Sequence, residues 1–147
     1  MIFDRTGLLS WNQAITASAA SENVIDLGQS GKPIGSATAL ARDIGPGTGV
    51  PLYVGVTEAF NTLTSLTVTI QTDDNEGFSS PTTVWTSPAY TLAQLAVGAK
   101  FMLPDEFPVG TNERYVRLYY TVAGSAPSTG KITAGVVAAR QTNSGRY

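Results

Sequence analysis

The sequence contains neither cysteine nor histidine in its 147 residues. Without cysteine there are no disulfides, so stability must come from burial and hydrogen bonding, which serve equally well in a reducing cytoplasm. Without histidine, Cys/His metal sites, Ser-His-Asp triads and Cys-His pairs are excluded, and no side chain has an unperturbed pKa near neutrality. Most hydrolytic chemistry therefore lacks its usual side chains, and we expect no cofactor and no metal held by cysteine or histidine.

Charged residues are also few, at 14% of the chain, and the net charge is −2. The nine Lys and Arg residues are scattered singly, without the basic run that would attract phosphates or an anionic membrane. No apolar stretch approaches the length of a membrane span, and Asp4 and Arg5 stand where a signal peptide needs an apolar core. We expect no nucleic-acid partner, no membrane partner, and a soluble protein made in the cytoplasm.

Thr, Ser, Gly, Ala and Val are abundant while Lys and Glu are scarce, a composition that favours strands and turns over helices. About eight strand-like stretches are separated by turn signals, which predicts an all-β fold, either a sandwich or a barrel. The length is that of one domain with one core.

The clearest of these stretches runs from Thr111 to Ala139 and is predicted to be a β-hairpin that turns between Gly124 and Gly130. Its first strand alternates with a period of two. One face carries Val116, Leu118, Tyr120 and Val122, and the other carries Tyr115, Arg117, Tyr119 and Thr121. The returning strand uses small residues, as expected of a strand packed closely on both faces.

Two further stretches, Leu52–Phe60 and Ser65–Thr72, alternate in the same way, and the short turn between them predicts that they are antiparallel neighbours. Ala14–Leu27 predicts two short strands or one bulged strand. Shorter elements are expected as strands at Thr83–Thr86 and Lys100–Leu103 and as a turn of helix at Tyr90–Ala96.

The first eleven residues contain apolar side chains that follow no regular period. We interpret residues 1–11 as an N-terminal arm, packed either on its own domain or on a neighbouring protein. Residues 12–147 then form a single domain.

Several motifs that could bind a ligand have a plainer interpretation. Gly31 and Lys32 lack P-loop spacing and are followed by Pro33. The GPGTG run at Gly45–Gly49 could cradle an anion, but no helix follows it, and we favour a plain loop. Asp73–Pro81 departs from EF-hand spacing, so a solvated loop is favoured over a calcium site.

Two carboxylate pairs, Asp73 with Asp74 and Asp105 with Glu106, lie beside turn residues and are interpreted as solvated turns rather than as a glycosidase pair. Aromatic side chains on strands could stack on sugars, although they more often lie in a core or a subunit interface. The aromatic residues in question are Trp11, Trp85, Tyr53, Tyr115 and Tyr119.

Arginines at positions 114 and 117 flank Tyr115 on the strand described above. Arginine and tyrosine are both enriched where proteins meet, so this outward face is a candidate contact surface. The alternative is an ordinary salt-bridged strand face.

Five stretches occur in an order and spacing typical of one protein family. They are MIFD at the start, NVIDLG from Asn23, RDIGPGTGVPL from Arg42, GTNERYVRLYYTV from Gly110 and GKITAGVV from Gly130. Together they resemble the cement, or capsid-decoration, proteins of short-tailed bacteriophages, over a span from Met1 to about Gln141.

The resemblance implies a jelly-roll β-sandwich and a non-enzymatic protein that binds the outer surface of the major capsid protein shell and stabilises it by bridging neighbouring subunits. It implies a virion protein that is assembled in the host cytoplasm and has no small-molecule substrate. A second copy of the chain is the other expected partner, in a homodimer or alternatively a homotrimer. A receptor- or carbohydrate-binding virion module, such as a head fibre, is the alternative function.

We expect partner contacts in three regions: the arm, the loop that begins at Arg42, and the arginine and tyrosine face of the strand after Thr111. The candidate interface residues are Ile2, Phe3, Trp11, Arg42, Asp43, Ile44, Arg114, Tyr115, Arg117 and Tyr119.

Overall fold

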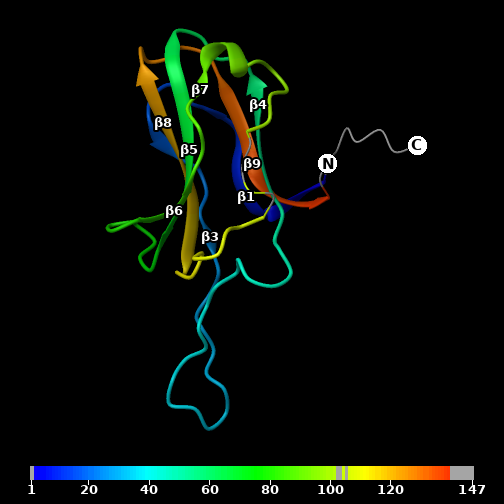
Figure 1. The fold of residues 1–147 in the computed structure, drawn as a ribbon, viewed down its shortest axis with the longest axis vertical. Coiled ribbons are helices and arrows are strands. Elements are labelled where there is room, and N and C mark those ends of the chain that lie inside the picture. The colour runs from blue at the N-terminus through cyan, green and yellow to red at the C-terminus, as the bar shows by residue number, and fades with distance from the viewer. Residues whose placement is uncertain (1, 102–103, 105, 140–147) are drawn as a thin grey trace, which may run out of the picture.

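Alternating apolar and polar residues fold into two antiparallel sheets that pack face to face in the computed structural model, which describes residues 2–101, 104 and 106–139 (Figure 1). The first sheet, in the order β1-β9-β4, consists of β1 (Ile2–Ala14), β9 (Lys131–Ala139) and β4 (Leu52–Glu58). The second sheet has the order β2-β8-β5-β6, with β2 (Ala19–Ala20), β8 (Tyr115–Gly124), β5 (Leu63–Asp73) and β6 (Thr82–Thr86). Two short strands add to it: β3 (Ile25–Asp26) pairs with β8, and β7 (Tyr90–Thr91) pairs with β5.

Residues 98–101 extend the first sheet along β4. Gly55 forms a bridge with Lys100, and Phe101 N donates to Val54 O at 3.1 Å. With this edge the strand order is that of a jelly roll, so the predicted all-β sandwich is confirmed. The rest of the predicted strand, at residues 102–103, lies outside the described residues.

Helix is limited, in the part of the chain that the structure describes, to the 3-10 turn η1 (Leu92–Gln94). It lies within the predicted turn of helix. No helix among the described residues combines the length and the apolar character needed to cross a membrane.

One core lies between the sheets and is built from the alternating residues of both. Its most fully buried side chains include Leu66, Val68 and Ile70 from β5, Val116, Leu118 and Tyr120 from β8, and Ile132 and Ala134 from β9. β9 is the middle strand of its sheet, and Thr133, Gly135 and Val137 on its other face are buried as well. The small residues of this strand therefore predicted correctly that it packs closely on both faces.

The predicted hairpin of residues 111–139 is wrong, because β8 and β9 lie in opposite sheets. Residues 125–130 instead carry the chain across the gap of about 10 Å that separates packed sheets. β4 and β5 are not neighbours either, since β4 pairs with β9 and β5 with β8. A period of two identifies the side chains that face the core, but it does not identify the strand that is hydrogen-bonded alongside.

The turn between β4 and β5 also crosses from one sheet to the other, and Asn61 in this turn is bonded to the crossover at residues 125–130. Its side-chain oxygen accepts from the backbone nitrogens of Ser128 (2.9 Å) and Thr129 (3.2 Å), and its amide nitrogen donates to the Ser128 hydroxyl (2.8 Å). The turn after β4 and the turn after β8 therefore form one unit at the end of the sandwich.

The first residues of the chain lie in the sheet as β1, which pairs with β9. Packing on their own domain is thus the alternative that the structure contains, and the boundary predicted after residue 11 falls inside β1. Register shifts leave residues 4–7 as a bulge in the ladder. Asp4 shapes this bulge, because its carboxylate accepts from the backbone nitrogen (2.9 Å) and the hydroxyl (2.8 Å) of Thr6, and these bonds lower the pKa of Asp4. The bulge explains why the apolar residues here show no regular period.

The segment from 14 to 27 forms the two short strands β2 and β3, one of the two predicted arrangements. Residues 28–50 then make a long loop between β3 and β4 that extends well beyond the end of the sandwich (Figure 1). Every residue from 29 to 41 is exposed.

Candidate functional site

Three aromatic rings form a cluster at β1 and β4. Phe3 packs edge to face against both of its neighbours, with its ring centroid 6.2 Å from that of Trp11 and 5.7 Å from that of Tyr53. We call Phe3, Trp11 and Tyr53 the aromatic patch. Trp11 is 57% exposed, so the patch presents apolar surface to solvent, and Ile2, next to Phe3 in the chain, is 66% exposed.

Close backbone packing explains why Phe3 can reach Trp11. A Cβ atom on Gly135 of β9 would lie 2.8 Å from the carbonyl oxygen of Gly7. A Cβ atom on Gly7 would lie 2.7 Å from the Cβ atom of Val136. Glycine at both positions lets the bulge of β1 approach β9. The chain before the bulge then places the Phe3 ring beside the rings of Trp11 and Tyr53.

A basic group borders the patch at Tyr53. The ammonium nitrogen of Lys100 lies 5.9 Å from the centroid of the Tyr53 ring. Partial burial raises the pKa of Tyr53, so the phenol remains neutral at ordinary pH.

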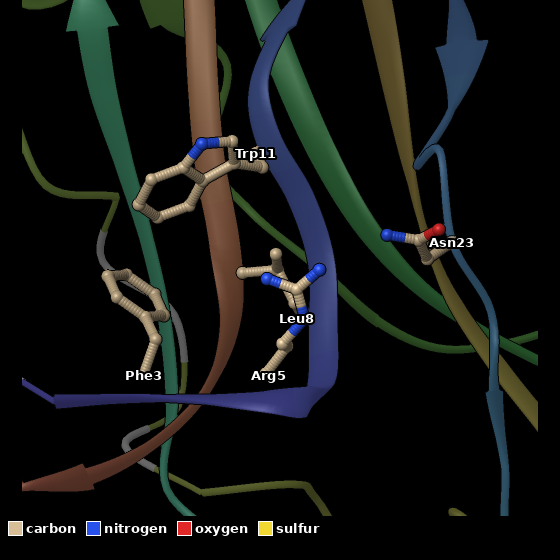
Figure 2. Close-up of a pocket in the computed structure, with 5 residues that line it drawn as sticks. All are labelled: Phe3, Arg5, Leu8, Trp11 and Asn23. Carbon is tan, nitrogen blue, oxygen red and sulfur yellow. The ribbon is translucent and has the colours of Figure 1, made fainter.

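A groove of about 460 Å³ runs beside the patch and is lined by Phe3, Arg5, Leu8, Trp11 and Asn23. Figure 2 shows Phe3 and Trp11 on one side of β1 and Asn23 on the other, with Arg5 and Leu8 between them. The groove thus combines an apolar wall with a guanidinium and an amide. The sequence interpretation singled out Phe3 and Trp11 but missed Arg5, Leu8 and Asn23. The bulge of β1 had no recognised signal, and Asn23, whose backbone nitrogen donates to Leu9 O at 2.9 Å, comes from another segment.

The predicted arginine face lies on the other sheet, at the start of β8. Arg114 forms a bidentate pair with Asp26, with Nε to Oδ1 at 2.8 Å and the terminal nitrogen to Oδ2 at 2.7 Å. The Arg114 guanidinium also lies 4.9 Å from the centroid of the Tyr115 ring. The hydrogen bonds from Arg114, together with one from the backbone nitrogen of Gly28, lower the pKa of Asp26 to about 2. The salt-bridged strand face that we considered as the alternative therefore describes Arg114.

Arg117 is held differently, by aromatic rings. Its guanidinium carbon is 4.0 Å from the centroid of the Phe78 ring and 5.7 Å from that of Tyr119, and its Nε donates to the side-chain oxygen of Gln71 at 2.9 Å. Desolvation lowers the pKa of Arg117, which nevertheless stays fully charged at neutral pH. Arg117 and Tyr119 therefore form an ordered, partly exposed surface next to Tyr115.

The third predicted region, at Arg42, Asp43 and Ile44, holds the base of the long loop. The Asp43 carboxylate accepts from the backbone nitrogens of Gly45 (2.9 Å) and Gly110 (2.8 Å), and Ile44 N donates to Thr111 O at 3.2 Å. These contacts are within the chain. They also occupy the Gly45 nitrogen, one of the donors that an anion site in the GPGTG run would need.

Arg42 and Arg114, predicted in separate regions, lie at one shallow hollow of about 420 Å³. Arg42 donates to the carbonyl oxygen of Gly28. Asp74 and Glu113 line the same hollow, so its charges are mixed. The region at Arg42 and the region at Arg114 therefore meet where β3 pairs with the start of β8 in the second sheet. The third region, with Ile2, Phe3 and Trp11, lies apart from them on β1 of the first sheet.

Among the residues that the structure describes, no group of three or more Asp and Glu side chains is placed to hold a metal ion. Asp73 is 1% exposed, and its two carboxylate oxygens accept from the backbone nitrogens of Asn75 and Ser80, each at 2.8 Å. These bonds lower the pKa of Asp73. The loop at 73–81 is thus organised around a buried carboxylate rather than a solvated one. The pair Asp105 and Glu106 lies partly outside the described residues.

The model of a family described as Bbp16 matches residues 9–140 of the chain. The matched span begins inside β1 and contains every later strand of the sandwich. No curated protein matches the chain.

Proposed function

Because the chain belongs to the Bbp16 family, whose phage-type name associates it with bacteriophages, we propose that it is a capsid cement protein. In this role it binds the outer surface of the shell made by the major capsid protein. It bridges neighbouring subunits and performs no catalysis. It joins the virion after synthesis in the host cytoplasm.

The observation that carries the proposal is the exposed aromatic patch. Large apolar side chains that stay exposed on a rigid surface commonly mark sites of protein contact, and Trp and Tyr are enriched among the residues that dominate binding energy. Phe3 holds Trp11 and Tyr53 in place through its two edge-to-face contacts, so little side-chain freedom is lost when a partner covers them.

A lattice makes modest contacts sufficient. Once one contact of a bridging protein has formed, a second contact to the neighbouring subunit is effectively intramolecular and gains from a high local concentration. Self-association into a homodimer or a homotrimer would place several patches on one particle, in keeping with the rotational symmetry of a closed shell.

Purified protein mixed with undecorated capsids tests the proposal. We expect saturable, stoichiometric cosedimentation and a rise in the temperature at which the shells disrupt. Trp11→Ala should weaken binding roughly 30-fold, the loss typical of a residue that dominates an interface. Val97→Ala is the matched control, because Val97 is 66% exposed and lies outside the patch. An absence of binding by the unmodified protein refutes the cement function.

Carbohydrate binding is the second candidate, and the groove of Figure 2 is the observation that favours it. An exposed indole can stack on the apolar face of a sugar, while the Arg5 guanidinium and the Asn23 amide can bond its hydroxyl groups. A glycan array separates the two candidates. Glycan binding that Trp11→Ala abolishes, without any binding to capsids, would replace the first proposal with the second.

A further inference from the structure

The long loop between β3 and β4 has a defined shape at its far end. Loops of more than about 12–15 residues without secondary structure are uncommon in compact domains and are usually functional or disordered. Here the backbone closes on itself, because Leu40 N donates to Gly31 O at 2.9 Å. Figure 1 shows that, among the residues that the structure describes, this closed end lies farthest from the sandwich. We call residues 31–40 the loop tip.

A tight turn in the loop tip presents one isoleucine. Ser36 N donates to Pro33 O at 3.0 Å, which closes a four-residue turn, and Gly35 at its third position has φ of +81°, a conformation that favours glycine. Ile34 occupies the second position. Its relative exposure is 107%, the highest of the large hydrophobic side chains in the described residues, and Leu40 in the same tip is 59% exposed.

The base of the loop is fixed to the sandwich on both sides. Gly28 N donates to Asp26 Oδ1 at 2.7 Å, and Asp26 is itself paired with Arg114. On the returning side the Asp43 carboxylate accepts from Gly110 N. An apolar side chain on a segment ordered in this way loses less conformational freedom on binding than one on a loose loop.

We propose that the loop tip is the second contact of the bridge and that it inserts Ile34 into an apolar pocket of the capsid shell protein. This inference rests on the proposed cement function. A bridge needs two contact surfaces that are well separated. The aromatic patch lies on the sandwich itself, whereas the loop tip reaches beyond its end (Figure 1).

Charge indicates the kind of pocket that fits. Lys32 is the single charged residue between positions 28 and 41, and it is two residues from Ile34. The complementary site is therefore an apolar pocket with carboxylates at its rim, since opposite charges across an interface steer the two surfaces together.

Binding to undecorated capsids by Ile34→Asp tests the inference. Loss of one of two linked contacts should lower the apparent affinity about 100-fold and remove the gain in shell stability. Val97→Asp introduces the same charge at another exposed aliphatic residue, outside both surfaces, and should change neither the affinity nor the stabilisation. Equal binding and equal stabilisation by wild type and Ile34→Asp overturn the inference but leave the cement function standing. Failure of the wild type to bind overturns both.

A loop deletion provides a second variant. Since Gly31 and Leu40 are already joined by a hydrogen bond, residues 32–39 can be removed with the two ends left close together. We expect this variant to keep the wild-type unfolding temperature and to bind capsids as weakly as Ile34→Asp. Wild-type capsid binding by this variant would contradict the inference.

A site-specific cross-link identifies the partner directly. The chain has no cysteine, so Ile34→Cys carries a single thiol for a short photo-activated cross-linker. On decorated capsids we expect a cross-link to the shell protein from position 34 and none from Val97→Cys. A cross-link from position 34 only to another copy of this chain would show that the loop tip joins copies to each other, and would overturn the inference.

Discussion

Ser10 and Tyr120 join the two sheets of the sandwich through a hydrogen bond of 2.8 Å between their buried hydroxyl groups. Ser10 Oγ donates to Gln13 Oε1 at 2.6 Å, so Tyr120 is the donor to Ser10. Gln13 completes the network, because its amide nitrogen donates to Ala20 O (2.8 Å) and its oxygen also accepts from Glu22 N (3.1 Å). Breaking a buried network of this kind lowers stability, because a buried donor without a partner has given up its hydrogen bonds to water and gains none in return.

The two ends of this bond should respond differently to mutation. Ser10→Ala leaves the Tyr120 hydroxyl buried without a partner and should cost about 1–3 kcal/mol of unfolding free energy. Tyr120→Phe removes the donor but leaves Ser10 bonded to Gln13, and should cost about 0.5–1.5 kcal/mol. Urea unfolding measures both, with Tyr119→Phe on the outer face of β8 as the control. A larger loss for Tyr120→Phe than for Ser10→Ala would contradict the assigned direction of the bond.

Alkaline pH should destabilise the fold through the same tyrosine. Burial raises the pKa of Tyr120 above its ordinary value of about 10, so above that pH the folded protein binds more protons than the unfolded chain. Stability is therefore complete below about pH 10 and falls as the pH rises further. Tyr120→Phe should fall less steeply, with a residual slope because burial also raises the pKa of Tyr53. Identical slopes for the variant and the wild type would contradict this account.

Acid should remove a different contribution, at Asp26. Pairing with Arg114 lowers the pKa of Asp26 to about 2, whereas an unfolded aspartate titrates near 3.9. The stability from this pairing is therefore present above about pH 4 and is lost as the pH falls towards 2. We expect Asp26→Asn to show a shallower loss of stability over this interval in urea unfolding, with a residual slope because hydrogen bonds also lower the pKa of Asp4 and of Asp73. If Asp26→Asn and the wild type lose the same unfolding free energy as the pH falls towards 2, the pairing of Asp26 with Arg114 contributes nothing in solution.

The sequence predicted the faces of the strands better than their neighbours. The alternation of Val116, Leu118 and Tyr120 identified the core side of β8 correctly, because the period of two depends only on local geometry. The same alternation suits a hairpin and a crossover equally well, and the hairpin prediction failed for that reason. The link between Asn61 and Ser128 joins residues 67 positions apart and has no local signal.

The candidate surface was predictable in its residue types but not in its arrangement. Exposed aromatic residues suggested a contact site, yet Phe3 and Trp11 come together only because the bulge at residues 4–7 lies over Gly135. Asp4 and Thr6, which shape the bulge through two hydrogen bonds, read in the sequence as ordinary polar residues. Likewise Ile34 stands out only once the turn that exposes it is seen.

Gly135→Ala tests how far the aromatic patch depends on this close packing. The added Cβ atom would lie 2.8 Å from Gly7 O and 2.9 Å from the Leu8 Cα atom, so the backbone of β1 must move away from β9. Overpacking of this kind costs about 1–3 kcal/mol. Gly31→Ala is the matched control, because nothing lies within 4 Å of the added atom there, and its unfolding free energy should stay near that of the wild type.

The same variant should lose capsid binding in excess of its loss of stability. Any movement of β1 displaces Phe3 from Trp11 and Tyr53, whose rings it holds in place, while the loop tip is untouched. We therefore expect folded Gly135→Ala to bind capsids about as weakly as Trp11→Ala, and a double variant of the two to bind no more weakly than either alone, because both changes remove one contact. Additive losses in the double variant would show that Gly135 and Trp11 act on separate contacts, and that the packing of β1 on β9 does not set the geometry of the patch.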